Sequence, residues 1–485
     1  MTMMEEGQWW SYVSLGVAML LVAVTFMARN FNEWANPVRL KPGDPPLPPG
    51  KMGWPLIGET LRFMTEDYHQ LYQRKLKKFG RTWKTHVFGN PTICMTTADN
   101  AREVLITKQG LFEANYPDSM RRILGMKNFM FLRGAEHLKV KRFFQVALRP
   151  ESIRSSVGQV EEMALLSLRD LEGRTISVLR EARLFSFNAA ISLLFGASPS
   201  EEMVRLGEEF ELLDKAIFSL AIDLPWTTFR KGIKARERIL KLMKKKIYQR
   251  RSETGTKNND VMSLMLQPID GETLTDEEIA DSLLAGLFAG QDTTATALHW
   301  GIYHLSQCPE ALEDLTKEVD SIKRKKNDGE PLTWDDFKNM PFASAVVSES
   351  VRLNVASFLM RQAQTDVIID GYTIPKGWTV VAWTRFFHTD PANVKDPMTF
   401  NPRRFMEEPK PSNLMIWGAG ARTCPGYEFS KLEGACFFYH LINKYTWEVV
   451  PNPRRKLVNM PVPHLSDGLQ IRLHKRDYGS PNTAQ

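Results

Sequence analysis

The side chain with the clearest chemical potential is Cys424, one of only four cysteines among 485 residues. Glycines at 418, 420 and 426 surround it, and a predicted amphipathic helix starts near Tyr427. Glycine lets backbone amides approach the sulfur, and a helix N-terminus favours negative charge, so this loop favours a thiolate. We expect the other three cysteines, which form no CxxC pair, to be packing residues: Cys94, Cys308 and Cys436.

A second unusual pattern is the run over residues 289–294, which reads Ala-Gly-Gln-Asp-Thr-Thr. It lies in the middle of a long predicted helix over 275–308, which a Thr275 to Glu278 capping box opens and a proline closes. Glycine costs about 1 kcal/mol inside a helix, and threonine competes for backbone hydrogen bonds. Helix stability therefore does not explain this run, and the alternatives are a solvated polar kink or a functional site.

The cysteine loop resembles the haem-binding signature of the cytochrome P-450 superfamily, F-x-x-G-x-R-x-C-x-G. Gly420, Arg422, Cys424 and Gly426 match it, and Trp417 stands in place of the usual phenylalanine. The resemblance implies that Cys424 is the axial iron ligand of haem b, iron protoporphyrin IX. Two interpretations of Trp417 stay open: its indole N–H donates to the sulfur and shifts the haem potential, or its ring packs on the porphyrin.

Three further segments match the same family. Residues 48–58, PPGKMGWPLIG, are similar to the proline-glycine segment of microsomal members. Glu349 and Arg352 match the E-x-x-R pair, whose spacing puts both side chains on one helix face, although such pairs are common on protein surfaces. Arg404 lies in a segment similar to P-x-R-F. The resemblance implies a buried Glu349, Arg352, Arg404 triad that fixes the haem-side core.

The run at 289–294 resembles the family motif A-G-x-D/E-T-T/S, in which a hydroxyl and a carboxylate relay protons to dioxygen. By position, the resemblance implies that Thr293 delivers the proton and that Asp292 is the acid that feeds it. It also implies that Gly290 lets the helix open a groove over the haem.

Haem propionates require cations, and the resemblance supplies four candidates. Arg422 lies in the signature itself, and Arg361 matches an arginine that reaches a propionate. His137 and Lys141 occupy the tryptophan and arginine positions of the family element W-x-x-x-R. We rank Arg422 and Arg361 first, because the other two would equally suit a solvated basic helix face.

These motifs need elements that position them. Long helical patterns dominate residues 98–350, whereas short strand patterns with tight turns occur before them and from residue 361 onward. We therefore predict a mainly α protein with a small β subdomain built from early and late parts of the chain. The resemblance implies the cytochrome P-450 fold, with haem between the long central helix and the cysteine loop.

The N-terminus differs in composition from the rest of the chain. Residues 9–28 carry no charge, and a helix of twenty residues spans roughly 30 Å, the thickness of a hydrocarbon core. We predict a membrane anchor over 1–30, a proline-rich hinge over 31–50 and a haem-thiolate monooxygenase catalytic domain over 51–485. Basic residues follow the apolar stretch, which predicts a single-pass protein of the endoplasmic reticulum membrane with its catalytic body in the cytosol. A cleaved signal peptide is the disfavoured alternative, because no basic segment precedes the stretch.

The formal net charge of +7 is modest for this length and gives no support to nucleic-acid binding. The chain also contains no G-x-G-x-x-G fingerprint for a flavin or nicotinamide. A haem enzyme of this kind would therefore take electrons from NADPH through a separate NADPH-cytochrome reductase, or from a cytochrome b-type donor. Four cations near the cysteine-side face are candidates for docking an acidic flavoprotein: Lys139, Lys141, Arg142 and Lys431.

Segments at the family's pocket-lining positions are mostly apolar, which suits a lipophilic substrate. The overall pattern resembles plant membrane-bound enzymes that oxidise terpenoids, steroids and derived hormones, and so implies hydroxylation of a terpenoid or steroid-type molecule. Two alternatives are a haem-thiolate isomerase or dehydratase, which needs no reductase, and a haem-binding sensor or carrier without turnover. The intact Asp292 and Thr293 argue against the isomerase.

Overall fold

The computed structural model describes residues 3–196, 201–253, 260–355, 359–408, 413–460 and 462–477. The chain forms two compact units. Unit 1 consists of Met1–Asn115 and Phe358–Trp383, and unit 2 consists of Tyr116–Ser357 and Thr384–Gln485. The segment predicted as one catalytic domain, 51–485, therefore contributes to both units.

Unit 1 carries the small β subdomain. Its five-stranded sheet has the order β1-β2-β8-β5-β3, in which β2 and β8 are parallel and the other neighbours are antiparallel. Strands from early and late parts of the chain share this sheet, which confirms the predicted β subdomain. The strands of unit 1 are β1 (Thr82–Val87), β2 (Asn90–Met95), β3 (Phe112–Ala114), β5 (Leu359–Ala363), β6 (Val367–Ile369), β7 (Tyr372–Ile374) and β8 (Thr379–Ala382).

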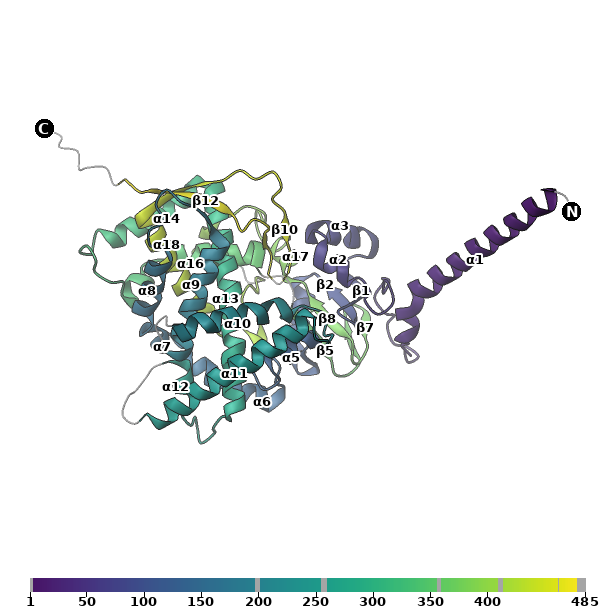
Figure 1. The fold of residues 1–485 in the computed structure, drawn as a ribbon, viewed down its shortest axis with the longest axis horizontal. Coiled ribbons are helices and arrows are strands. Elements are labelled where there is room, and N and C mark those ends of the chain that lie inside the picture. The colour runs from purple at the N-terminus through teal and green to yellow at the C-terminus, as the bar shows by residue number, and fades with distance from the viewer. Residues whose placement is uncertain are drawn as a thin grey trace. The chain divides into compact units, whose positions relative to one another are not determined.

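The helices of unit 1 include the predicted anchor, α1 (Met3–Ala35). Its segment Trp10–Ala35 is long and apolar enough to cross a membrane, with a mean hydropathy of 2.0 and no burial, so it fits a membrane anchor. Figure 1 shows α1 projecting away from β1 and β2. The remaining helical segments are α2 (Thr60–Thr65), α3 (Tyr68–Phe79), α4 (Ala98–Arg102), η1 (Glu103–Thr107) and η2 (Gln109–Leu111).

Helix α1 extends five residues beyond residue 30, the predicted end of the anchor. The helix continues through Ala35, because no proline occurs before Pro37. Asn32 is 1% exposed and donates to the backbone oxygen of Met52 at 3.0 Å, while its own side-chain oxygen accepts from the Leu56 N–H at 2.9 Å. The first residues assigned to the hinge are thus helical and fixed to the following chain.

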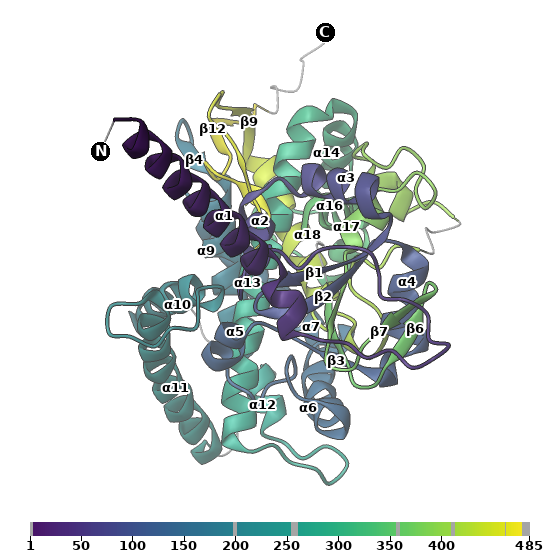
Figure 2. The same cartoon turned by 90° about the vertical axis from the view of Figure 1, so that its right-hand side faces the viewer.

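Unit 2 is predominantly helical. Figure 2 shows α10 and α11 as neighbouring helices joined by a loop. Its α-helices are α5 (Asp118–Leu124), α6 (Gly134–Ala147), α7 (Pro150–Arg154), α8 (Val157–Ser167), α9 (Val178–Phe195), α10 (Glu201–Ile217), α11 (Thr228–Ser252), α12 (Val261–Met265), α13 (Asp276–Gln307), α14 (Pro309–Lys323), α15 (Trp334–Lys338), α16 (Pro341–Ser350), α17 (Thr384–His388) and α18 (Tyr427–Lys444). Its short segments are η3 (Val351–Val355), η4 (Pro402–Phe405), η5 (Gly420–Arg422), β4 (Thr175–Ser177), β9 (Tyr445–Val449), β10 (Leu457–Val458), β11 (His464–Leu465) and β12 (Gln470–Lys475).

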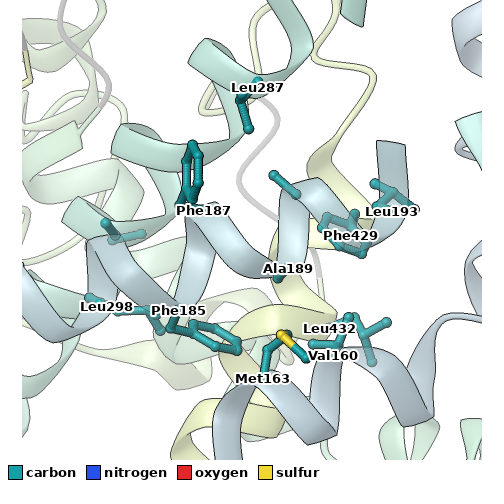
Figure 3. Close-up of a cluster of buried hydrophobic side chains, with 14 of the residues drawn as sticks. Val160, Met163, Phe185, Phe187, Ala189, Leu193, Leu287, Leu298, Phe429 and Leu432 are labelled. Atoms are coloured by element: carbon teal, nitrogen blue, oxygen red, sulfur yellow. The ribbon is translucent and has the colours of Figure 1, made fainter. Parts of the chain in front are cut away.

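Helix α13 has the predicted length and the predicted start. The Thr275 hydroxyl accepts from the Glu278 N–H at 3.2 Å, and the Glu278 carboxylate accepts from the Thr275 N–H at 2.8 Å, which completes the capping box. Helix α9 packs along α13. Figure 3 shows that α8, α9, α13 and α18 contribute side chains to one apolar cluster: Val160, Met163, Phe185, Phe187, Ala189, Leu193, Leu287, Leu298, Phe429 and Leu432.

The cysteines outside the glycine-rich loop occupy different surroundings. Cys94 on β2 and Cys436 on α18 are fully buried, which confirms their prediction as packing residues. Burial raises the pKa of the Cys94 thiol to about 12, so this group stays protonated at neutral pH. Cys308, which caps the end of α13, is only half-buried.

Candidate active site

The loop that carries Cys424 is held in a tight turn between η5 and α18. The Cys424 N–H donates to the backbone oxygen of Trp417 at 2.8 Å. Gly418 and Gly420 have φ angles of +76° and +65°, in the left-handed region that favours glycine. Trp417 is half-buried, and the centre of its ring lies 6.3 Å from that of Tyr427. Both interpretations of its indole stay predictions.

The charge state of Cys424 depends on opposing effects. Desolvation raises the pKa of its thiol, whereas a hydrogen bond from the Gly426 N–H and the nearby Lys141 ammonium lower it. Since desolvation is the largest of these, the loop alone does not stabilise the thiolate that its glycine pattern predicts. A metal ion deprotonates a thiol that coordinates it, so a bound iron would supply the missing stabilisation.

The predicted propionate cations of unit 2 lie close to the cysteine loop. The Arg422 guanidinium donates to the backbone oxygens of Phe129, Met130 and Leu132 at 3.0, 2.8 and 2.5 Å. On α6, the Lys141 ammonium donates to the Ala421 oxygen at 2.5 Å, and burial lowers its pKa, as does the charge of Arg422.

His137 and Lys141 are 4% and 7% exposed, so the alternative that they belong to a solvated helix face is wrong. Helix α6 presents these two residues, four apart, to the interior, and its basic composition alone does not show this. The burial of Lys141 also corrects its assignment to an exposed docking face.

Arg361 lies in unit 1, on β5. Its backbone pairs with Val380 of β8 and Ala114 of β3, and its side chain is 6% exposed. One guanidinium nitrogen donates to the Met360 oxygen at 2.9 Å. Its role towards a propionate stays a prediction.

Neighbouring side chains of the polar run on α13 contact different parts of the structure. The Thr293 hydroxyl donates to the Ala289 oxygen at 2.6 Å, one turn earlier in the helix. Asp292 is 4% exposed and forms a bidentate ion pair with Arg183 of α9, at 2.9 and 3.3 Å. Asp292 is buried, so the alternative of a solvated polar kink is wrong for this residue.

Two further carboxyl groups were not predicted from the sequence. Glu433 of α18 accepts from the Thr294 hydroxyl at 3.0 Å, and burial holds its pKa well above the ordinary value. Burial, and then the charge of Asp292, raises the pKa of Asp214 on α10 to about 7, while Arg183 acts in the opposite direction. An acid within the apolar stretch of α18 was a usable signal for Glu433, whereas Asp214 and Arg183 lie in ordinary charged helices.

The structure brings Glu349, Arg352 and Arg404 together. Arg352 donates two hydrogen bonds of 2.7 Å to the Glu349 carboxylate, and Arg404 donates a third at 3.0 Å. Glu349 and Arg352 are 0% exposed. The Asn401 N–H also donates to Glu349 at 2.9 Å, so the carboxylate has four donors.

The residues around Cys424 and α13 fit a haem. Within the described part of the chain, no group of three or more His, Cys, Asp or Glu could hold a metal ion, so Cys424 is a single thiol donor. A single cysteine thiolate is one of the axial ligands by which proteins hold a haem iron. Among the residues that the structure describes, a Cβ added to Gly426 would meet nothing within 4 Å, and one added to Gly290 would meet only the Ala190 side chain at 3.6 Å. The described neighbours thus do not require these glycines, and they leave room for a bound group.

Comparisons with known proteins identify the family of this chain. The Cytochrome P-450 family model matches residues 48–468. Abscisic acid 8'-hydroxylase 1 of Arabidopsis thaliana is 38% identical over 84% of this chain and 86% of that protein. Abscisic acid 8'-hydroxylase 1 of Oryza sativa subsp. japonica is 37% identical over 83% and 85%. A solved structure of a retinoic acid bound cyanobacterial CYP120A1 superposes with a TM-score of 0.81 and 28% identity, over 90% of this chain and 100% of that one.

The chain therefore belongs to the cytochrome P-450 family and has its fold. It is a monooxygenase, and membership implies a haem iron, a redox partner and a lipophilic substrate.

The buried charge cluster generates a stability prediction. We expect Arg352→Met to lower the free energy of unfolding by about 3–5 kcal/mol, because it leaves the Glu349 charge buried without its main partner. The control is Lys317→Met, which removes an ion pair whose side chains are 67% and 66% exposed and should cost less than about 1 kcal/mol. Urea unfolding followed by circular dichroism measures both, and equal losses would contradict a structural role for the cluster.

Proposed function

We propose that this monooxygenase hydroxylates a lipophilic isoprenoid carboxylic acid, with electrons from NADPH delivered by a separate NADPH-cytochrome reductase. The observation that carries the reaction is the thiol of Cys424 in the same unit as the Asp292 and Thr293 pair of α13. The substrate class is supported by the relatives, which are named for abscisic acid, and by the similar structure bound to retinoic acid. Both compounds are isoprenoid acids, a subset of the terpenoid class that the sequence indicates.

In this proposal Cys424 coordinates the haem iron, and Arg422, Arg361, His137 and Lys141 form its polar surroundings. The haem supplies the chemistry that activates dioxygen. The Thr293 hydroxyl is the final proton donor, and its bond to Ala289 fixes its oxygen on one side of α13. Asp292 supplies Thr293, and Gly290 provides space beside it.

The acid pair near Thr293 has a means of holding a proton at neutral pH. Burial and the charge of Asp292 raise the pKa of Asp214 to about 7, so this carboxyl group can gain or lose a proton near neutral pH. Arg183 pairs with the ionised Asp292. This arrangement keeps one exchangeable proton, on Asp214, near Asp292, which precedes Thr293 on α13.

The proposed surroundings of the enzyme are the endoplasmic reticulum membrane, with α1 as a single anchor and the body in the cytosol. The cysteine-side face would receive the reductase. A cavity of about 330 Å³ there is lined by Cys424, Gln145, Arg149 and Tyr427, among others. Arg149 is exposed and makes no ion pair within the part of the chain that the structure describes, so it is better suited than Lys141 to attract an acidic partner.

The substrate class is tested by turnover of the full chain with haem, NADPH and a NADPH-cytochrome reductase. We expect abscisic acid or retinoic acid to gain one oxygen atom, and their methyl esters to have a kcat/KM at least about tenfold lower, because an ester loses the charge-assisted contacts of a carboxylate. Mass spectrometry detects the products. Conversion of a neutral sterol but of neither acid would overturn the substrate class.

The same assay separates the alternatives. An isomerase or dehydratase would convert a lipid hydroperoxide without NADPH, and a carrier would bind haem without forming any product. The red-shifted absorption of the reduced carbon monoxide complex reports the thiolate, and it should vanish in Cys424→Ser.

The proton-delivery role predicts uncoupling. In Thr293→Ala, NADPH oxidation should continue while product per NADPH falls roughly tenfold or more and hydrogen peroxide accumulates, because the final proton donor is lost. Thr293→Ser keeps the hydroxyl and should retain most of the coupling. Full coupling in Thr293→Ala, measured as product against NADPH, would refute the assignment.

The proposed docking face predicts that reversing one charge lowers turnover supported by the reductase but not turnover supported by hydrogen peroxide. Arg149→Glu should lower turnover supported by reductase by about tenfold at low salt, and less at high salt, since attraction to an acidic partner is screened. Turnover supported by hydrogen peroxide should not change. Lys244→Glu on α11 is the matched charge reversal and should have no effect. An equal loss of reductase-supported and peroxide-supported turnover in Arg149→Glu would contradict the proposal.

A further inference from the structure

The loop between α5 and α6 has a fixed contact at each end. The loop covers residues 125–133, and we refer to the part that makes these contacts as the 125–132 loop. At its start it meets Asp281 of α13, and at its end it meets Arg422 of the cysteine loop. All of these residues belong to unit 2. The loop therefore links the central helix to the segment that carries Cys424 by contacts that do not involve the haem.

The first contact is built around the buried Asp281 carboxylate, which is 1% exposed. It accepts from the Lys127 N–H at 3.1 Å and from the Arg236 guanidinium of α11 at 2.5 Å. Gly125 has a φ of +86°, and a Cβ there would lie 2.1 Å from a carboxylate oxygen of Asp281. Only glycine fits at this position, so the loop is pressed against the carboxylate.

Contacts in the middle of the loop restrain its conformation between the two ends. Asn128 is 0% exposed; its amide group donates to the Gly125 oxygen at 2.6 Å, and its side-chain oxygen accepts from the Met130 N–H at 2.8 Å. The ring of Phe129 packs on that of Phe144, with centroids 4.6 Å apart. These contacts leave the loop little freedom to move at one end without the other.

The second contact is the set of three backbone oxygens that accept from Arg422, at Phe129, Met130 and Leu132. Arg422 precedes Cys424 by two residues. Hydrogen bonds to a charged guanidinium are stronger than those between neutral groups, so the loop and the cysteine segment restrain each other.

We propose that Asp281 is a positioning residue for the cysteine loop, which it holds in place through the 125–132 loop and Arg422. Asp281 lies three turns before Asp292 on α13 and takes no part in the proton pathway proposed above. This role of Asp281 concerns the geometry around Cys424 and does not depend on the identity of the substrate.

The test is hydrogen exchange of the haem-loaded full chain, measured by mass spectrometry on peptides that cover 125–133 and 418–426. Asp281→Ala removes the acceptor of the Lys127 N–H and the partner of Arg236. We expect exchange to rise about tenfold in both peptides, the factor that follows from losing one hydrogen bond to a charged group. Asp281→Asn keeps an oxygen that accepts from the Lys127 N–H but loses the charge that pairs with Arg236, so we expect a smaller rise in exchange in both peptides. This variant supplies the test if Asp281→Ala does not fold.

The control is Asp260→Ala, which removes another buried aspartate of unit 2 that pairs with an arginine, Arg250, and is 6% exposed. It should raise exchange near α12 and leave the cysteine loop unchanged. A second measurement, the fraction of the reduced carbon monoxide complex with red-shifted absorption, should fall in Asp281→Ala and stay constant in Asp260→Ala. A response of 125–128 alone, or equal responses of the cysteine loop in both variants, would overturn the proposal.

Discussion

The position of the cysteine loop depends on the burial of one carboxylate, that of Glu349. Removing such a charge from water costs several kcal/mol, and the cost is offset only when its hydrogen-bonding capacity is filled. Two guanidinium groups and the Asn401 N–H fill it here. The cluster therefore fixes the end of α16 against η4. Helix α16 in turn packs on α18 so closely that a Cβ on Gly434 would lie 2.2 Å from the Val347 side chain. Because α18 begins three residues after Cys424, a shift in the position of the charge cluster would also shift the Cys424 thiol.

Three consecutive residues of α13 show how one helix serves several functions. Asp292 reaches Arg183 of α9, Thr293 reaches the backbone of its own helix, and Thr294 reaches Glu433 of α18. Successive side chains on a helix point about 100° apart, so neighbours in sequence meet different helices. Asp292 and Glu433 are thereby kept on opposite sides of Thr293. Their environments differ as well: among the described residues, Asp292 pairs with a guanidinium group, whereas Glu433 accepts from a hydroxyl and burial keeps its pKa high.

The sequence predicted the features that depend on local spacing. The limits of α13, its capping box, the start of α18 and the division between helices and a small sheet all follow from periodicity, caps and turns. Features that depend on which helix faces which were missed. The periodicity of α6 could not show that Lys141 meets Ala421, 280 residues later, and nothing near Arg183 indicated that it meets Asp292. A helical pattern gives the angle of a side chain about its own axis, whereas the partner across the interface is set by packing of the whole unit.

The basic residues near Cys424 also depend on packing, because the fold determines which of them have an acidic partner. Counted from the sequence, they form a cationic surface, but most of them already have acidic partners. Lys139 lies 3.7 Å from Glu278, Arg142 pairs with Asp270, and Lys431 lies 3.3 Å from Glu428. A paired cation attracts an incoming acidic protein less than an unpaired one, because the field of its partner cancels much of its own at a distance. Attraction of a redox partner is therefore governed by which cations lack partners, and the number of lysines and arginines in the segment does not measure it.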